Sequence, residues 1–156
     1  MTILKTGIFF VLVPVICLAA VPIWLILTTP VLFSFWIFRW LAFPCWLVGW
    51  MFMILCSWQF ATRGEGTPNP LDPPRQLVVD GLYGYVRNPI YFGATAVLLG
   101  YVLWHPALPI LLMPLIGTMA WVLFVHLYEE PHLRKTFGAA YEQYCSSVPR
   151  WIPRFR

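Results

Sequence analysis

The chain has 156 residues, of which 60% are hydrophobic and only 10% are charged. Soluble domains carry about 45–50% apolar and about 25% charged residues, so this composition excludes an ordinary soluble domain and a disordered chain. The net charge of +4 does not indicate nucleic-acid binding, because the first 62 residues contain only two charged side chains, Lys5 and Arg39. The other charges gather in two later stretches, which is typical of a polytopic membrane protein with its polar groups at one face of the bilayer.

The two N-terminal spans are predicted within residues 1–62. The first runs from about residue 7 to 28, and it is too long and followed by too many further apolar runs for a cleaved signal peptide. The second covers residues 40–61. Between them, residues 31–38 are apolar but short, and they either lie at the membrane interface or extend the second helix.

A polar segment, residues 63–88, separates these spans from two more in residues 89–156, and its glycines and prolines exclude a regular helix. The third span, residues 89–104, begins with a proline and would extend only ~24 Å at ~1.5 Å per residue. The fourth, residues 108–128, carries no charge except one that His126 can gain. We therefore expect an all-α polytopic membrane protein, a single domain over residues 1–156 with about four transmembrane helices.

After the last span, the sequence predicts a C-terminal amphipathic helix over residues 130–147, lying on the membrane surface. One side of it is apolar and carries Leu133, Phe137, Tyr141 and Tyr144. With four spans, nine of the ten basic residues share one side of the membrane, and Arg39 alone lies on the other. The positive-inside rule makes the basic side cytoplasmic, in a bacterial inner membrane or an equivalent one.

The four cysteines, Cys17, Cys45, Cys56 and Cys145, share no C-x-x-C spacing, and three of them lie in apolar runs. This pattern predicts neither a disulfide framework nor a zinc site. We expect the cysteines to act as small apolar side chains, and we expect no metal.

The first cluster of candidate functional residues surrounds the start of the third span. Asn88 precedes Pro89 and is a natural helix N-cap, and Arg87 lies just outside. The free N–H groups of a helix start suit an anion, and Tyr83 and Tyr91 offer aromatic faces for a planar ring or a cation. An ordinary junction of loop and helix with interfacial aromatic residues would show the same pattern.

The second cluster ends the fourth span. Glu129 and Glu130 follow an uncharged apolar run, and charges so close to hydrocarbon favour a functional role. Either carboxylate could pair with His126 three or four residues earlier on one helix face. The alternatives are solvated acids at the membrane boundary and a histidine that only packs or donates a hydrogen bond.

Together, three segments resemble the isoprenylcysteine carboxyl methyltransferase and phospholipid methyltransferase superfamily. They are the run from Arg87 to Gly93, the pair Glu129-Glu130, and residues 137–150 of the tail. Residues 88–131 are also similar to phosphatidylethanolamine N-methyltransferases, and residues 64–74 and the tail resemble small bacterial members of the carboxyl methyltransferase branch. Asn88 stands where eukaryotic carboxyl methyltransferases usually have His, and Gly84 where many relatives have Arg.

The resemblance implies an integral membrane enzyme that uses S-adenosylmethionine, yields S-adenosylhomocysteine and holds this cofactor outside any Rossmann fold. It implies that the cofactor lies between the first cluster and the glutamate pair, at the cytoplasmic ends of the last two spans. The residues that the resemblance implies for the cofactor site are Gly64, Gly66, Leu77, Val86, Arg87, Asn88, Tyr91, Gly93, Glu129 and Glu130. We add Tyr83 to this set for its aromatic face.

The implied partners are the membrane bilayer and a lipid or prenylated acceptor. Carboxyl methylation of an isoprenylcysteine-like or other lipid needs a cationic clamp, for which Arg150 is the candidate. N-methylation of an amino-phospholipid such as phosphatidylethanolamine needs a base, for which Glu129 or His126 could serve. The resemblance of the tail, residues 137–150, mildly favours carboxyl methylation over N-methylation. A non-catalytic four-helix scaffold is the third hypothesis, and it predicts no ligand between Arg87 and Glu129.

Overall fold

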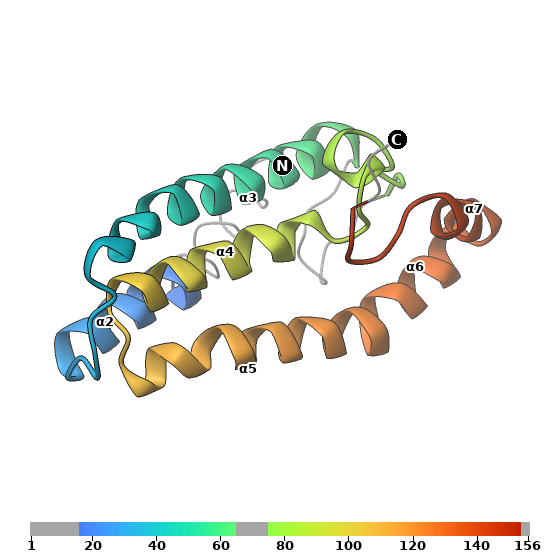
Figure 1. Cartoon of the computed structure of the whole chain (residues 1–156). Coiled ribbons are helices and arrows are strands. Elements are labelled where there is room, and N and C mark those ends of the chain that lie inside the picture. The colour runs from blue at the N-terminus through green and yellow to red at the C-terminus, as the bar shows by residue number, and fades with distance from the viewer. Residues whose placement is uncertain (1–15, 65–74, 154–156) are drawn as a thin grey trace.

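The computed structural model describes residues 16–64 and 75–153, and within these ranges it contains helices and no strands. The predicted all-α fold is therefore confirmed for the described residues. Figure 1 shows α3 (Ala42–Arg63), α4 (Pro89–Trp104) and α5 (Leu108–Phe124) running side by side along the length of the molecule. The shorter α2 (Val21–Thr28) lies at one end of this group.

Two helices are long and apolar enough to cross a membrane. One is Trp36–Arg63, in which the 3-10 turn Trp36–Leu41 leads into α3, and the other is Leu108–Phe137. Pro89–Trp104 and Ile16–Thr28 are apolar but shorter, so the predicted count of four spans is not confirmed. Residues 7–15 of the predicted first span lie outside the described residues.

The bounds of α4 are those predicted, and the other expected helices differ in detail. Of residues 31–38, only the last three are helical, and they extend the second helix. The fourth helix continues without a break from α5 through a π-helical turn, Val125–Glu129, into α6 (Glu130–Phe137). The predicted single helix over residues 130–147 is wrong, because the chain turns at Gly138 before α7 (Ala139–Ser147).

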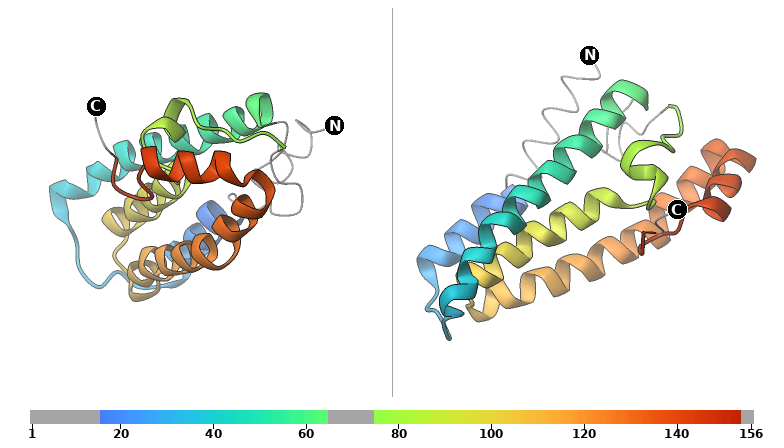
Figure 2. Two further views of the ribbon diagram at one scale, coloured as in Figure 1. Left: turned by 90° about the vertical axis from the view of Figure 1, so that its right-hand side faces the viewer. Right: turned by 45° about the horizontal axis from the view of Figure 1, so that its top comes forward.

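The turn at Gly138 has a physical reason in its backbone angles. Its φ is +51°, a conformation that side chains with a Cβ rarely adopt and that glycine tolerates. As a result, α7 turns across the end of the bundle (Figure 2). The apolar side chains expected on one face still pack together, because Tyr141, Tyr144 and Val148 form a buried cluster against Leu77. That face therefore covers protein and not only the membrane surface.

Helices α3 and α4 touch through their backbones at a pair of glycines. A Cβ placed on Gly49 would lie 2.6 Å from the carbonyl oxygen of Gly93, and one placed on Gly93 would lie 2.7 Å from the carbonyl oxygen of Gly49. Small residues allow such close crossings of membrane helices, where packing is the main source of association. Gly93, predicted to line a cofactor site, thus faces α3.

The substitution Gly49→Val should separate α3 from α4 and lower the free energy of unfolding by about 1–3 kcal/mol, the usual cost of overpacking. Thermal unfolding of the purified protein in detergent measures this effect. Gly84→Ala is the matched control, because the added Cβ would meet only the carbonyl oxygen of Val79 at 3.4 Å. An unfolding temperature of Gly49→Val equal to that of the wild type would contradict the glycine contact.

Candidate functional site

The start of α4 is held by the C-terminal tail. Pro89 is the first residue of α4, as predicted, and Asn88 occupies the N-cap position. The side chain of Asn88 makes no capping hydrogen bond, so that part of the prediction is wrong; its Nδ2 instead donates to the carbonyl oxygen of Arg150 over 3.2 Å. The backbone N–H of Arg87 donates to the carbonyl oxygen of Pro149 over 2.9 Å.

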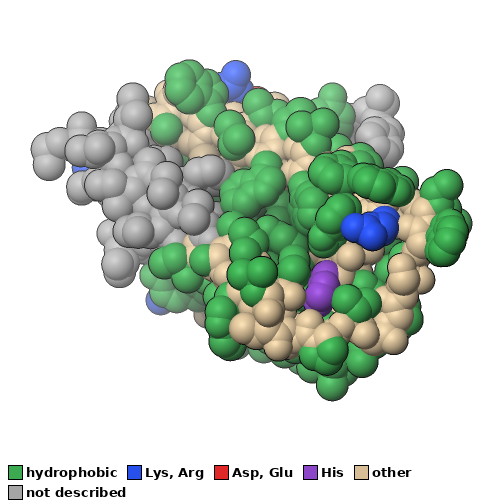
Figure 3. Space-filling model, turned by 90° about the vertical axis from the view of Figure 1, so that its left-hand side faces the viewer, with side chains coloured by type: hydrophobic (Ala, Val, Ile, Leu, Met, Phe, Trp, Pro, Cys, Tyr) green, Lys and Arg blue, Asp and Glu red, His purple; other side chains and the backbone are tan. Residues whose placement is uncertain are grey.

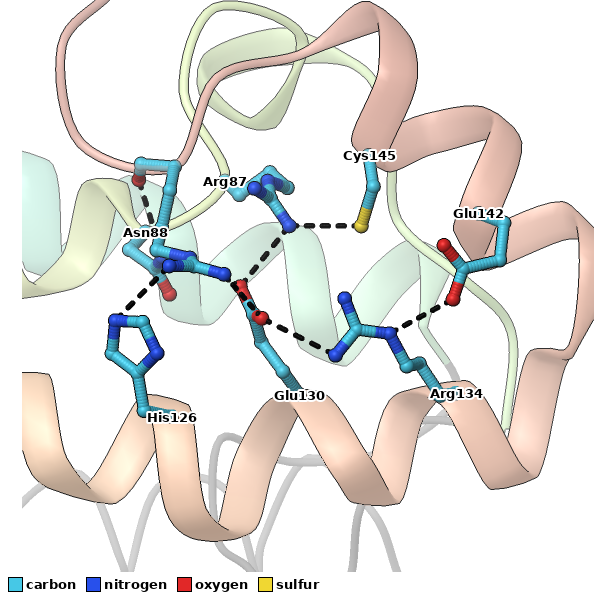
Figure 4. A network of polar contacts seen from close by, with 8 residues as sticks. Arg87, Asn88, His126, Glu130, Arg134, Glu142 and Cys145 are labelled. Carbon is cyan, nitrogen blue, oxygen red and sulfur yellow. Dashed lines mark hydrogen bonds and ion pairs between the residues drawn. The ribbon is translucent and has the colours of Figure 1, made fainter.

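Glu130 is a buried carboxylate surrounded by guanidinium groups, as Figure 4 shows. The residue is 3% exposed. Its Oε1 accepts from Arg87 Nη1 at 3.0 Å and from Arg150 Nε at 2.7 Å. Its Oε2 accepts from Arg150 Nη2 at 2.7 Å, and Arg134 Nη1 lies 3.6 Å away. A buried carboxylate is tolerated only when it is paired in this way. We call these four residues the arginine cluster.

Arg134 also donates through Nε to Glu142 Oε1 over 2.8 Å, across the junction between α6 and α7. The three guanidiniums of the cluster thus face two carboxylates, those of Glu130 and Glu142. Counted together with Glu142, the cluster has one positive charge in excess, which favours an anionic group beside it.

Glu129 points to a different partner. Its Oε2 accepts from the Tyr91 hydroxyl over 2.8 Å, and the Tyr91 ring lies 5.9 Å from the Trp121 ring and 6.3 Å from the Trp151 ring. No ion pair to Glu129 is found among the residues that the structure describes. The two adjacent carboxylates therefore differ in their partners: Glu130 is paired with arginines, whereas Glu129 accepts from a neutral phenol beside aromatic rings.

His126 contacts Arg150, and the predicted pairing of His126 with Glu129 or Glu130 is wrong. Arg150 Nη1 lies 3.0 Å from His126 Nε2. Because a guanidinium can only donate, Nε2 is the acceptor in this contact. The three residues predicted to be catalytic, Glu129, His126 and Arg150, thus lie at one end of the bundle, next to the start of α4.

Cys145 is a member of this site that the sequence analysis missed. Arg87 Nη1 donates to its Sγ over 2.8 Å, from α7 across to the start of α4 (Figure 4). The two residues are 58 positions apart, and no spacing in the sequence relates them. The available signal was the resemblance of residues 137–150 of this chain to the family's tail, because it marks α7 as part of the site.

A cavity of about 520 Å³ lies between the segment that precedes α4 and helix α7, and its lining includes none of the four residues of the arginine cluster. Tyr144 donates a hydrogen bond to the carbonyl oxygen of Tyr83 over 2.8 Å, and burial raises the pKa of Tyr144, which keeps it a neutral donor. Among the predicted cofactor residues, Leu77 lines this cavity. The lining residues are Leu77, Val79, Gly84, Tyr85, Ala140, Gln143, Tyr144, Ser147, Val148 and Pro149.

The remaining predicted residues lie outside the contacts of the arginine cluster. Tyr83 is buried and its ring lies 5.2 Å from that of Phe60, and Val86 is also buried. The carbonyl oxygen of Gly64 accepts from the backbone N–H of Arg75 at 2.7 Å, so the ends of the two described ranges are in contact. Gly66 lies outside the described residues. Within residues 16–64 and 75–153, no group of three or more His, Cys, Asp or Glu side chains is placed to hold a metal ion.

The family profile for phospholipid methyltransferases matches residues 17–140, which include Arg87, Asn88, Tyr91 and both glutamates. The chain belongs to the phospholipid methyltransferase family. This family member is also similar to protein-S-isoprenylcysteine O-methyltransferase of Schizosaccharomyces pombe, with 34% identity over 84 residues. The matched region is 49% of this chain and 33% of that protein, so the chain covers only about a third of the length of this curated relative. No solved structure matches.

Proposed function

We propose that the protein is an S-adenosylmethionine-dependent methyltransferase that acts on a lipophilic acceptor at the cytoplasmic face of the membrane. The observation that supports this most directly is the meeting of two distant segments: Arg87 contacts Glu130, and Tyr91 contacts Glu129. A basic cluster and a second carboxylate thus lie side by side. A separate cavity on the other side of α7 has a volume within the range of about 300–1,000 Å³ typical of small-molecule sites.

The charges of the site fit the proposed cofactor. S-Adenosylmethionine carries a carboxylate, an amine and a positive sulfonium, and its ribose carries two hydroxyls. We propose that Arg87 and Arg150 hold the carboxylate, because the cluster has positive charge in excess. Glu129, which has only a neutral donor, would hold the amine or the ribose hydroxyls. Glu130 would fix the arginines, since guanidiniums already occupy both of its oxygens.

The remaining residues would complete the walls of the site. Leu77 lines the cavity, and we propose that a planar ring lies there. Val86, Asn88 and Tyr83 would support this wall from the segment before α4, and Gly64 and Gly66 would border it. Because the structure turns Gly93 toward α3, we propose a packing role for that glycine.

When bound, the cofactor would supply an electrophilic methyl group on sulfur, so the protein needs no covalent nucleophile. Its work would be to position the reacting groups and to exclude water. Glu129, Tyr91 and the rings of Trp121 and Trp151 would form the dry side of the site. For carboxyl methylation, Arg150 would orient the acceptor carboxylate; this is the reaction that we favour, on an isoprenylcysteine-like or other lipid.

N-Methylation of an amino-phospholipid is a second candidate, favoured by the match to the phospholipid methyltransferase family and by Glu129. A carboxylate with no basic partner among the described residues could accept a proton from the acceptor ammonium. The non-catalytic scaffold would lack cofactor binding altogether.

The identity of the methyl acceptor can be determined from the stability of the labelled product in base. Purified protein in detergent would be given methyl-labelled cofactor with either a prenylated cysteine or phosphatidylethanolamine. We expect label in the prenylated cysteine, released by base as volatile methanol, because a methyl ester hydrolyses in base and an N-methyl group does not. Base-stable label in phosphatidylethanolamine would favour the second candidate. Absence of label in both, together with no binding of S-adenosylhomocysteine, would contradict the methyltransferase.

A further inference from the structure

Arg39 lies in an aromatic cluster at the end of the molecule opposite α6 and α7. Its guanidinium carbon is 4.3 Å from the centroid of the Trp104 ring and 5.6 Å from that of Trp40. The Phe43 ring is 5.6 Å from Trp104 and 5.8 Å from Trp40. Cations stack on indole rings because the ring faces are negative. The guanidinium is thus held in one place by two helices, without an acidic side chain.

No carboxylate neutralises Arg39 in the described part of the chain. Asp80 pairs with Arg63, Glu129 with Tyr91, and Glu130 and Glu142 with the arginine cluster at the far end. The Nε of Arg39 is buried and has no hydrogen-bond partner among the described residues. Figure 3, which faces this end, shows a mostly hydrophobic surface and no acidic side chain outside the grey region. The Nε itself is covered by the protein, whereas the residue as a whole is partly exposed, so an external acceptor would meet the terminal nitrogens of the guanidinium.

The length of α3 places Arg39 at a membrane interface. The 22 residues from Ala42 to Arg63 extend about 33 Å, close to the hydrocarbon thickness of about 30 Å. If Arg63 lies at one headgroup layer, Arg39 lies at the other. Trp40 and Trp104 beside it are the residues that prefer this layer. The acceptor available at this depth is the phosphate of a phospholipid.

We propose that Arg39, stacked on Trp104 and Trp40, binds the phosphate of an anionic phospholipid in the leaflet opposite the candidate methyltransferase site. The planar donors of a guanidinium match two phosphate oxygens, and its exposed apolar neighbours Phe38 and Leu41 give a surface for the acyl chains. An anionic headgroup fits better than a zwitterionic one, because an ammonium group would find no carboxylate beside Arg39 in the described residues. This site is separate from the proposed catalysis and does not depend on it.

Native mass spectrometry of the full chain in detergent tests the proposal by titration with phosphatidylglycerol, phosphatidylcholine and diacylglycerol. We expect the affinity order phosphatidylglycerol, phosphatidylcholine, diacylglycerol. Arg39→Gln should weaken phosphatidylglycerol binding roughly fivefold, the effect of one basic residue at an anionic surface. Arg39→Lys keeps the charge without the planar donors and should give an intermediate loss, which shows that the change is not one of folding.

Arg63→Gln is the control, since Arg63 is an arginine at the other end of the same helix and is already paired with Asp80. We expect it to bind phosphatidylglycerol as the wild type does. The proposal is overturned if Arg39→Gln binds this lipid with unchanged affinity, or if Arg63→Gln loses as much. It is also overturned if diacylglycerol binds equally well, or if millimolar inorganic phosphate displaces the lipid, which would indicate a site for a free anion.

Discussion

Glu130→Ala is expected to destabilise the protein by about 3–5 kcal/mol, because it leaves the guanidiniums of Arg87, Arg134 and Arg150 without their buried counter-charge. For a chain of about 150 residues this corresponds to a fall in unfolding temperature on the order of 10 °C. Thermal unfolding in detergent measures it.

The control for this prediction is Glu142→Ala. Its carboxylate also pairs with an arginine, but 58% of the side chain is exposed, so the expected loss is within about 1 kcal/mol. Equal shifts for the two variants would mean that Glu130 is not the electrostatic centre of the cluster. Glu130→Gln adds a finer comparison, because it preserves the shape of the side chain and removes its charge.

Glu129→Gln should weaken the binding of S-adenosylhomocysteine roughly ten- to a hundredfold, the effect of losing a hydrogen bond to a charged group, and should abolish most methyl transfer. Glutamine still offers an oxygen to the Tyr91 hydroxyl, so the fold should remain intact. Isothermal titration calorimetry in detergent measures the affinity, and the unfolding temperature of the unliganded variant reports on the fold.

Tyr91→Phe is the companion variant for Glu129→Gln. It keeps the ring against Trp121 and removes the donor that orients Glu129. Its loss of affinity should be smaller than that of Glu129→Gln. If Glu129→Gln binds S-adenosylhomocysteine like the wild type, Glu129 does not belong to the cofactor site.

The parts of the fold that were predictable from the sequence are those with local signals. Helix α4 begins at Pro89 and ends at residue 104 as predicted, because proline favours the first helical turn and Pro106 ends the helix that precedes it. The closeness of Arg87 to the glutamate pair was also expected, since the third span begins and the fourth ends on the same face. The direct ion pair between Arg87 and Glu130 was not expected, because the resemblance implied a cofactor between the two clusters. Family resemblance, and not spacing alone, supplied the reason to join them.

The remaining features depend on contacts between distant residues or on backbone angles. Nothing in the sequence states that Gly138 takes a positive φ, although glycine permits it. The choice of Glu130 over Glu129 by the arginines depends on the helical phase after the π-helical turn Val125–Glu129, which shifts every later side chain around the axis. The side chain of Asn88 does not cap α4, because its Nδ2 donates to the carbonyl oxygen of Arg150, 62 positions away in the sequence.

The bond between Arg150 and Glu130 has a consequence for biosynthesis. The ribosome makes residue 150 after all the helices described here, so a nascent chain with α5 and α6 already in place still lacks the guanidinium that contacts both oxygens of Glu130. Such an intermediate, or a product of premature termination just before this residue, holds an incompletely neutralised buried acid. Cellular proteases should therefore remove truncated copies faster than full-length ones.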